Sequence, residues 1–300
     1  MTRLTINHET VYRYSKPTRF GQHRLVLRPR EGHDLQIESM VLSITPGFSI
    51  EWSRDVFGNS VALVEFLESA TELRILSSVV IRRAVRTPPA SAGPYMVAYP
   101  VLYDELEQTV ASAYQVPTYP DELAQVSGWV KKVLAGSEST DAVGKVSLLN
   151  QAIFRDMRYQ RRETKGVQRP VETLAEKSGS CRDMATLLME ACRSLGIAAR
   201  FSSGYLDCAA ARAGMASTHA WAEVYFPGWG WTGFDPTLGE LTSFKHIAVG
   251  VSNHPRGVMP VSGRFYGNSF DYLGMKVSVK MDSEDPQPAT SPLASSPSSP

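Results

Sequence analysis

The sequence predicts an α+β domain that is preceded by an all-β sandwich. Two observations carry this prediction. Short alternating segments rich in Val, Ile, Leu, Phe and Tyr fill residues 4–81, whereas helical periodicity dominates residues 103–195. Strand patterns then return from residue 199 onward, so helices come first and an antiparallel sheet follows, which is the element order of an α+β domain.

The N-terminal segment contains short strands separated by turn residues. Asp55-Val-Phe-Gly58-Asn59 has the composition of a hairpin connection. Strands at such regular spacing are typical of an antiparallel sandwich. The expected strands are Leu4–Tyr14, Gln22–Leu27, Gln36–Ile44, Ser49–Ser53, Ser60–Leu67 and Glu72–Ile81.

Prolines and small residues at 87–97 indicate a boundary between two domains. We assign residues 1–90 to the sandwich, 98–281 to the α+β domain, and 282–300, which are mostly Ser, Pro, Ala and Asp, to a disordered tail. The helices expected in the second domain are Tyr103–Tyr114, Pro120–Ala135, Asp141–Tyr159 and one that begins at Cys181. The strands expected there are Ala199–Tyr205, His219–Phe226, Gly230–Asp235, His246–Val251 and Lys276–Lys280.

Charge and cysteine content narrow the class of protein. The 300 residues carry 31 basic and 30 acidic side chains, and a net charge of +1 gives no hint of nucleic acid or an acidic membrane surface as a partner. The N-terminus lacks the apolar run of a signal peptide, and no apolar stretch approaches the roughly 20 residues of a membrane helix. Three cysteines do not make a disulfide framework. We therefore expect a cytoplasmic protein with no membrane partner, and its oligomeric state is not predicted.

The helix that begins at Cys181 carries the first candidate site residue. Ser180 is a good N-cap, and Asp183 completes a capping-box pattern with Asp in place of Glu or Gln. Cys181 shares an apolar face with Met184 and Leu188, so its sulfur is expected to point into the protein from the helix N-terminus. The unpaired N–H groups and the helix dipole favour a thiolate there, and they could also hydrogen-bond an oxyanion.

A predicted hairpin supplies an imidazole and a carboxylate. His219 and Trp221 lie on one face of its first strand, and Asp235 ends its second strand. An even loop at 227–230 would place Asp235 opposite Ala222, on the wrong face for a contact with His219. We therefore predict an odd-length loop or a bulge, which would set Asp235 beside or diagonal to His219.

The order Cys, His, Asp on helix, strand and strand resembles the transglutaminase-like cysteine hydrolase superfamily. The blocks that carry the resemblance are Gly179-Ser-Cys-Arg-Asp183, Leu195–Tyr205, His219-Ala-Trp-Ala-Glu223 and Gly230–Thr237. The N-terminal segment, with His8–Tyr14 and Leu25–Arg30, resembles the region often fused to bacterial members. The resemblance implies a papain-like transglutaminase core, in which Cys181 is the nucleophile, His219 is the base and then the acid, and Asp235 orients His219.

Three further residues are candidates for substrate binding, namely Tyr159, Arg182 and Trp221. Trp221 also fits packing, and Arg182 also fits a solvated side chain. Animal transglutaminases use a tryptophan upstream of the cysteine to help hold the oxyanion, but none lies between Trp129 and Trp221 here. Tyr159 or the backbone N–H of Cys181 is the alternative donor.

The predicted chemistry is attack of a thiolate on an amide carbonyl of a peptide or protein substrate, through a thioester. Resolution by water gives a peptidase or amidase, whereas resolution by an amine gives a crosslinking transferase. Bacterial members of the family are mostly regarded as hydrolases, which favours the first. The alternatives are a non-catalytic binding or scaffold module and acyl transfer to an arylamine. His246 and His254 have no metal-spaced partners and no calcium loop is legible, so we predict no metal and no other cofactor.

Overall fold

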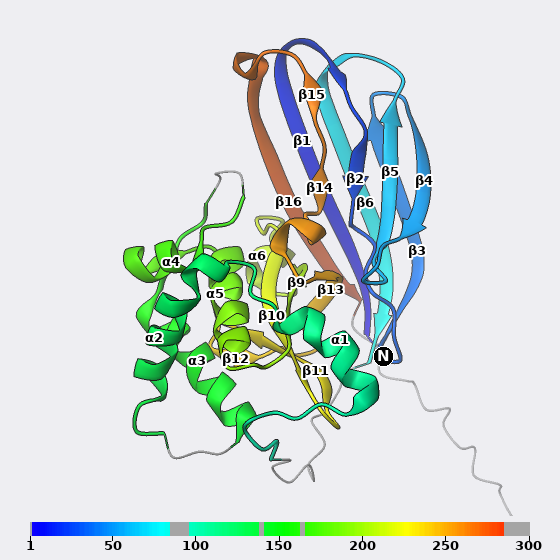
Figure 1. Ribbon diagram of the computed structural model, residues 1–300. Coiled ribbons are helices and arrows are strands. Elements are labelled where there is room, and N and C mark those ends of the chain that lie inside the picture. Colours follow the sequence, from blue (N-terminus) through cyan, green and yellow to red (C-terminus); the bar gives the residue numbers. More distant parts are fainter. Residues whose placement is uncertain (1, 85–95, 138–140, 163–165, 285–300) are drawn as a thin grey trace, which may run out of the picture.

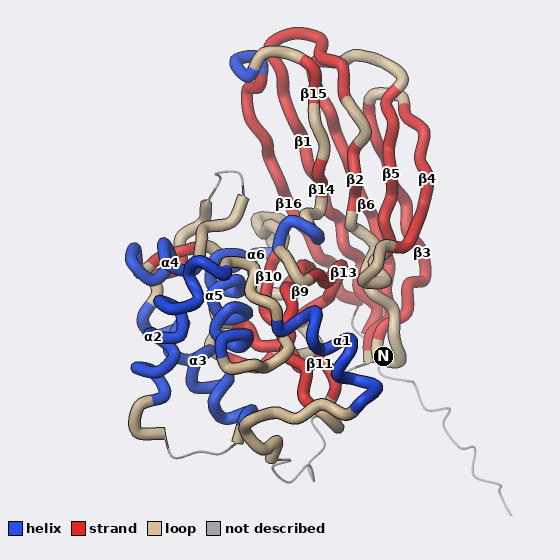
Figure 2. Tube along the Cα trace, in the orientation of Figure 1, coloured by secondary structure: helices blue, strands red, loops and turns tan. Residues whose placement is uncertain are grey.

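The computed structural model describes residues 2–84, 96–137, 141–162 and 166–284, and Figure 1 shows its fold. A β-sandwich occupies one end of the molecule, and helices packed against a third sheet occupy the other (Figures 1 and 2). This arrangement confirms the predicted α+β fold with an all-β region before it. None of the described helices is long and apolar enough to cross a bilayer.

The sandwich contains the six predicted N-terminal strands together with three strands from the C-terminal part of the chain. One sheet has the order β15-β1-β6-β3, with β16 also paired to β1, and the other has the order β14-β2-β5-β4. The strands are β1 (Thr2–Phe20), β2 (His23–Leu25), β3 (Leu35–Thr45), β4 (Phe48–Arg54), β5 (Ser60–Phe66), β6 (Ala70–Arg83), β14 (Val261–Ser262), β15 (Phe265–Tyr266) and β16 (Tyr272–Glu284).

The strand β16 corrects the predicted domain limits. It runs antiparallel along β1, with Leu4 opposite Ser283 and Tyr12 opposite Met275, as Figure 1 shows for the two long strands. The assignment of 98–281 to one separate domain was therefore wrong for the segment from β14 onward. The prediction of a disordered tail from residue 282 was also wrong for residues 282–284, which belong to β16. Residues 285–300 lie outside the described residues. Most of the predicted boundary at 87–97 lies outside them as well.

Burial explains why β16 returns to the sandwich. Its inward side chains Val279 and Met281 are almost fully buried in a cluster that includes Leu4 and Ile6 of β1. The apolar side chains of β16 thus bury surface that would otherwise meet water. Each Å² of apolar surface buried stabilises the fold by roughly 25 cal/mol. The sequence predicted a strand at Lys276–Lys280 but not its pairing with β1.

Five of the remaining strands form an antiparallel sheet of order β12-β11-β10-β9-β13, which we call the core sheet. Its strands are β9 (Ala199–Leu206), β10 (His219–Phe226), β11 (Gly230–Asp235), β12 (Glu240–Leu241) and β13 (His246–Ser252). A separate parallel pair joins β7 (Arg158–Tyr159) to β8 (Ser178–Gly179).

The helices precede or interrupt the core sheet. The α-helices are α1 (Glu105–Gln115), α2 (Leu123–Leu134), α3 (Ala142–Asp156), α4 (Pro170–Glu176), α5 (Cys181–Ser194) and α6 (Ala209–Arg212). Short 3-10 turns lie at η1 (Pro120–Glu122), η2 (Pro255–Val258) and η3 (Ser269–Asp271). The three helices predicted before Cys181 are confirmed, whereas α4 and α6 were not predicted from the sequence.

The helix α5 is the centre of the larger hydrophobic core. It begins at Cys181, and its fully buried side chains include Leu187 and Leu188. These pack in one cluster with Ala222 and Val224 of β10 and with residues of α2 and α3. The chain leaves the helix through Gly196, whose φ of 73° is a left-handed conformation that favours glycine. Burial of this apolar face fixes the N-terminus of α5 against the core sheet.

A second core joins the sandwich to the core sheet. Ile247 and Val249 of β13 are buried in the same cluster as Leu4 and Ile6 of β1. Beside it, the side chain of Asn59, in the predicted hairpin loop between β4 and β5, makes two hydrogen bonds to the backbone of Val251. Its Nδ2 donates to the carbonyl oxygen at 2.8 Å, and its Oδ1 accepts from the N–H at 2.9 Å.

We predict that Asn59→Ala lowers the free energy of unfolding by about 2 kcal/mol, because it leaves a buried N–H and C=O of β13 without partners. Asn59 itself has no exposed surface. Urea unfolding followed by circular dichroism measures the change, and Ser53→Ala, on the exposed strand β4, serves as the control. A loss no larger than that of the control would contradict the proposed role of Asn59 in holding β13 against the sandwich.

Candidate active site

The hairpin of β10 and β11 brings His219 and Asp235 to one side of the core sheet. Phe226 pairs with Gly230 and Ala222 pairs with Phe234, so the loop consists of the three residues 227–229. The prediction of an odd-length loop is therefore confirmed. Continuing this register places Asp235 opposite Trp221, on the same face as His219 and diagonal to it.

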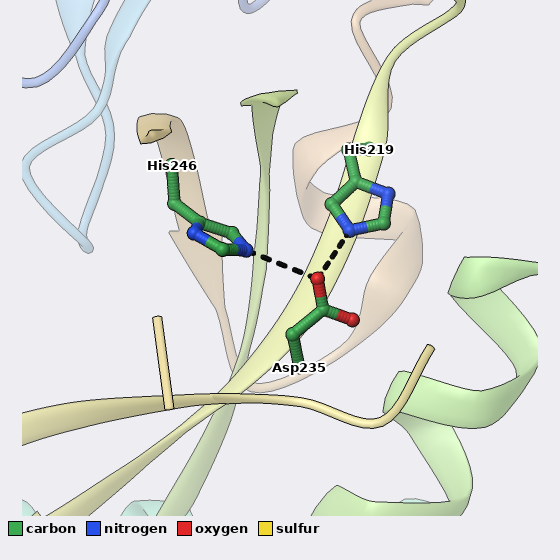
Figure 3. Close-up of side chains that lie close together, drawn as sticks. All are labelled: His219, Asp235 and His246. Carbon is green, nitrogen blue, oxygen red and sulfur yellow. Dashed lines mark hydrogen bonds and ion pairs between the residues drawn. The ribbon is translucent and has the colours of Figure 1, made fainter. Parts of the chain in front are cut away.

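Asp235 is a fully buried carboxylate whose two oxygens both accept hydrogen bonds. Oδ2 lies 2.6 Å from Nε2 of His219 (Figure 3). Oδ1 accepts from the backbone N–H of Thr237 at 2.9 Å and from its hydroxyl at 2.6 Å. Burial alone would raise the pKa of Asp235, but hydrogen bonds from His219, from His246 of β13 and from Thr237 outweigh it and hold the pKa well below its usual range.

Cys181 is the first residue of α5, and its side chain is buried with 7% of the residue exposed. Burial opposes the charge on the nearby imidazole of His219, but the hydrogen bonds and charges of Asp235 and Cys181 outweigh burial and raise the pKa of His219 to about 10. The imidazole is therefore hydrogen-bonded to a carboxylate and lies near enough to the thiol of Cys181 for that group to affect its pKa. No partner for the backbone N–H of Cys181 is found within the described part of the chain.

Asp183 anchors the N-terminus of α5. Its Oδ2 accepts from the backbone N–H and the hydroxyl of Ser180, both at 2.8 Å, which is the predicted capping interaction. Its Oδ1 accepts from Arg162 at 2.8 Å and from the backbone N–H of Gln168 at 2.7 Å. Burial opposes these bonds, yet together they lower the pKa of Asp183. The anchor ties the segment before α4 to the residues on either side of Cys181.

His246 is a site residue that the sequence analysis did not identify. It begins β13, and its Nε2 lies 3.0 Å from Oδ2 of Asp235, the oxygen that also faces His219 (Figure 3). In the core sheet β9 and β10 separate β13 from β11, so no local register links the two residues. Gly204 of β9 permits the close packing here, because a Cβ at this position would lie 2.1 Å from the carbonyl oxygen of Ile247.

The donor atoms of His219, Asp235 and His246 lie within 4.8 Å of one another, a grouping that could in principle hold a metal ion. The individual contacts favour hydrogen bonds instead. The separation of 2.6 Å between His219 and Asp235 is that of a charge-assisted hydrogen bond. We therefore treat the group as a hydrogen-bonded network.

The three predicted substrate-binding residues lie in different environments. Trp221 is buried, with 2% of the residue exposed, and its ring packs edge-on against His246 at 5.2 Å between centroids. This burial favours packing over substrate contact. Tyr159 is half exposed on β7, and burial of the rest of its side chain, followed by the charge of Cys181, raises the pKa of its phenol. Arg182 is partly exposed and donates to the carbonyl oxygen of Arg162 at 3.3 Å.

We predict that Asp235→Asn destabilises the protein by about 2 kcal/mol at pH 7, because two imidazoles lose a charged partner. Since the folded pKa of Asp235 is depressed, the contribution of its charge is complete above the ordinary pKa of about 4 and is lost as the pH falls through the folded value. Because Asp235 also raises the pKa of His219, the difference between wild type and variant should widen as the pH falls from 7 to 5, and it should then shrink below about pH 4 as the carboxylate of the unfolded chain is protonated.

Urea unfolding at pH 3, 4, 5 and 7 measures this difference. Asp34→Asn, which changes an exposed carboxylate, serves as the control and should show no such dependence. A gap between wild type and Asp235→Asn that is as wide at pH 3 as at pH 5 would contradict the assignment.

Comparison with known proteins places this geometry in a family context. Residues 4–82 match the bacterial transglutaminase-like N-terminal region, and residues 128–236 match the transglutaminase-like superfamily. An uncharacterized protein of Mycobacterium tuberculosis is 28% identical over 283 residues, which cover 89% of this chain and 88% of that protein. An uncharacterized protein of Mycobacterium leprae is 25% identical over 294 residues, which cover 93% and 99%.

A solved structure supports the fold. The crystal structure of a provisionally assigned cysteine protease from Cytophaga hutchinsonii has a TM-score of 0.70 and 19% sequence identity, and covers 95% of this chain and 92% of its own. The superfamily match spans His219 and also Cys181 and Asp235, the two residues that raise the pKa of its imidazole. Residues 128–236 thus match the core of the transglutaminase-like superfamily, and residues 4–82 match the bacterial N-terminal region that stands in front of that core.

Proposed function

We propose that this protein is a cysteine-dependent hydrolase of an amide bond in a peptide or protein. The observation that carries the proposal is the environment of His219, whose imidazole interacts with Asp235 on one side and with Cys181 on the other. The match to the transglutaminase-like superfamily supports cysteine-dependent amide chemistry in general. The triad and its individual roles are our assignment.

The proposed reaction begins with the Cys181 thiolate, paired with the imidazolium of His219. Because Asp235 engages Nε2, Nδ1 is the nitrogen of His219 left to exchange a proton with the sulfur. The thiolate attacks the amide carbonyl, and the leaving amine takes the proton from His219 as the thioester forms. Water, deprotonated by His219, then releases the acid and restores the thiol.

The developing oxyanion requires donors. The backbone N–H of Cys181 is the first of α5 and has no acceptor within its helix, so it can donate to that oxygen. The positive end of the helix dipole adds to this effect. We propose the Tyr159 hydroxyl as a second donor, since burial raises the pKa of the phenol, which stays protonated at neutral pH and able to donate.

We place this activity in the cytoplasm, as the sequence analysis expects. All three cysteines are free thiols, which fits a reducing compartment. Release of an amine to water rather than transfer to a second amine is the outcome we favour, on the resemblance to bacterial hydrolases of this family.

We predict that iodoacetamide alkylates Cys181 at least about tenfold faster than Cys208 at pH 7, although Cys181 is buried and Cys208 is partly exposed. Cys192 should be the slowest, since burial raises its pKa to about 12. Peptide mass spectrometry resolves the three rates. His219→Ala should lower the alkylation rate of Cys181 to that of Cys208. Equal alkylation rates of all three cysteines in the wild type would contradict the proposal.

We predict that Cys181→Ala abolishes amine release from any peptide or isopeptide that the wild type cleaves, while Cys208→Ala retains it. A library of such substrates, read by a fluorogenic amine assay, makes the comparison, and thermal unfolding checks that both variants fold. Adding a fluorescent primary amine as acceptor separates transfer from hydrolysis, because only a transferase incorporates it. Undiminished turnover in Cys181→Ala would contradict the assigned nucleophile.

A further inference from the structure

The ring of His246 is held on both of its nitrogens. Nε2 faces Oδ2 of Asp235 at 3.0 Å, and Nδ1 accepts a hydrogen bond from the backbone N–H of Ser243 at 3.1 Å. A backbone N–H can only donate, so Nδ1 must present a lone pair. The proton of the ring therefore lies on Nε2 and is donated to the carboxylate.

The surroundings of His246 leave its ring little freedom. The side chain is 4% exposed. The Trp221 ring stands nearly perpendicular to it, at an interplanar angle of 81°, and the two imidazoles of the site lie 6.0 Å apart between centroids. Figure 3 shows His219 and His246 approaching the same oxygen of Asp235 from two sides. An imidazole buried in this way, with both nitrogens committed, has a fixed direction.

We propose that His246 is a positioning residue of the active site, which orients the carboxylate of Asp235 and through it the imidazole of His219. This inference rests on the proposed function, since it assumes that His219 serves Cys181. The two ring nitrogens of His246 bond to Ser243 and Asp235, so its effect on His219 passes through Oδ2 of Asp235.

The need for such a residue follows from the geometry of the carboxylate. Thr237 fixes Oδ1 with two donors. If His219 were the only donor to Oδ2, the direction in which His219 approaches the carboxylate would depend on that one bond. The second donor from His246 limits rotation of the carboxylate about its Cβ–Cγ bond. The N–H of His246 also continues to stabilise the negative charge on Oδ2 when His219 gives its proton to the leaving amine.

The test compares His246→Leu, which removes the donor, with His246→Gln, whose amide can reach toward Oδ2 and donate again. The probe is iodoacetamide, because the alkylation rate of Cys181 reports on the imidazole and requires no substrate. We expect the rate in His246→Leu to fall about tenfold, with at least half of the wild-type rate restored in His246→Gln. His33→Leu, at an exposed histidine, should leave the rate unchanged.

Thermal unfolding and the alkylation rate of Cys208 separate positioning from a general loss of structure. If both His246 variants slow Cys181 equally while lowering the melting temperature equally, His246 is a packing residue and the inference is overturned. An unchanged rate in His246→Leu overturns it as well. Failure of the proposed function looks different, since Cys181 of the wild type would then show no advantage over Cys208 and no dependence on His219.

Discussion

The buried charge of Asp235 is the constraint on which the rest of the site depends. A carboxylate without exposed surface loses several kcal/mol of hydration, which donors from the protein must replace. Here four donors do so, from His219, His246 and the two groups of Thr237. They belong to β10, to β13 and to the turn after β11. The charge is stable only when these segments of the core sheet are all in place, so folding of the sheet and assembly of the site are one event.

The sandwich contributes to the same constraint from a distance. The strand β13 forms one edge of the core sheet and carries His246 at its start. Its next residues, Ile247 and Val249, are buried with Leu4 and Ile6 of the sandwich, and Asn59 holds the backbone of Val251. A mobile β13 would not hold His246 on the carboxylate. The shared core therefore gives the N-terminal region a physical role in the site, beyond any part it has in shaping access to it.

The sequence predicted those features of the molecule that depend on local periodicity. Side chains alternate between the two faces of a hairpin. Because His219 and Asp235 must share a face to interact, a loop with an odd number of residues could be inferred from the sequence. The start of α5 was equally local. His246 could not be found in this way, because β9 and β10 lie between its strand and that of Asp235 and no spacing in the chain records the contact. The pairing of β16 with β1 was missed for the same reason, since it joins residues about 270 positions apart.

Two buried aspartates near Cys181 illustrate why similar burial leads to different functions. Asp183 accepts from Arg162, from Ser180 and from a backbone N–H, none of which changes its protonation near neutral pH. It can only fix the helix N-terminus in space. Asp235 accepts instead from the imidazole of His219, whose pKa it helps to raise, and so its charge acts on a protonation equilibrium. Asp183 therefore fixes the position of the Cys181 sulfur, whereas Asp235 determines how firmly the imidazole of His219 keeps its proton.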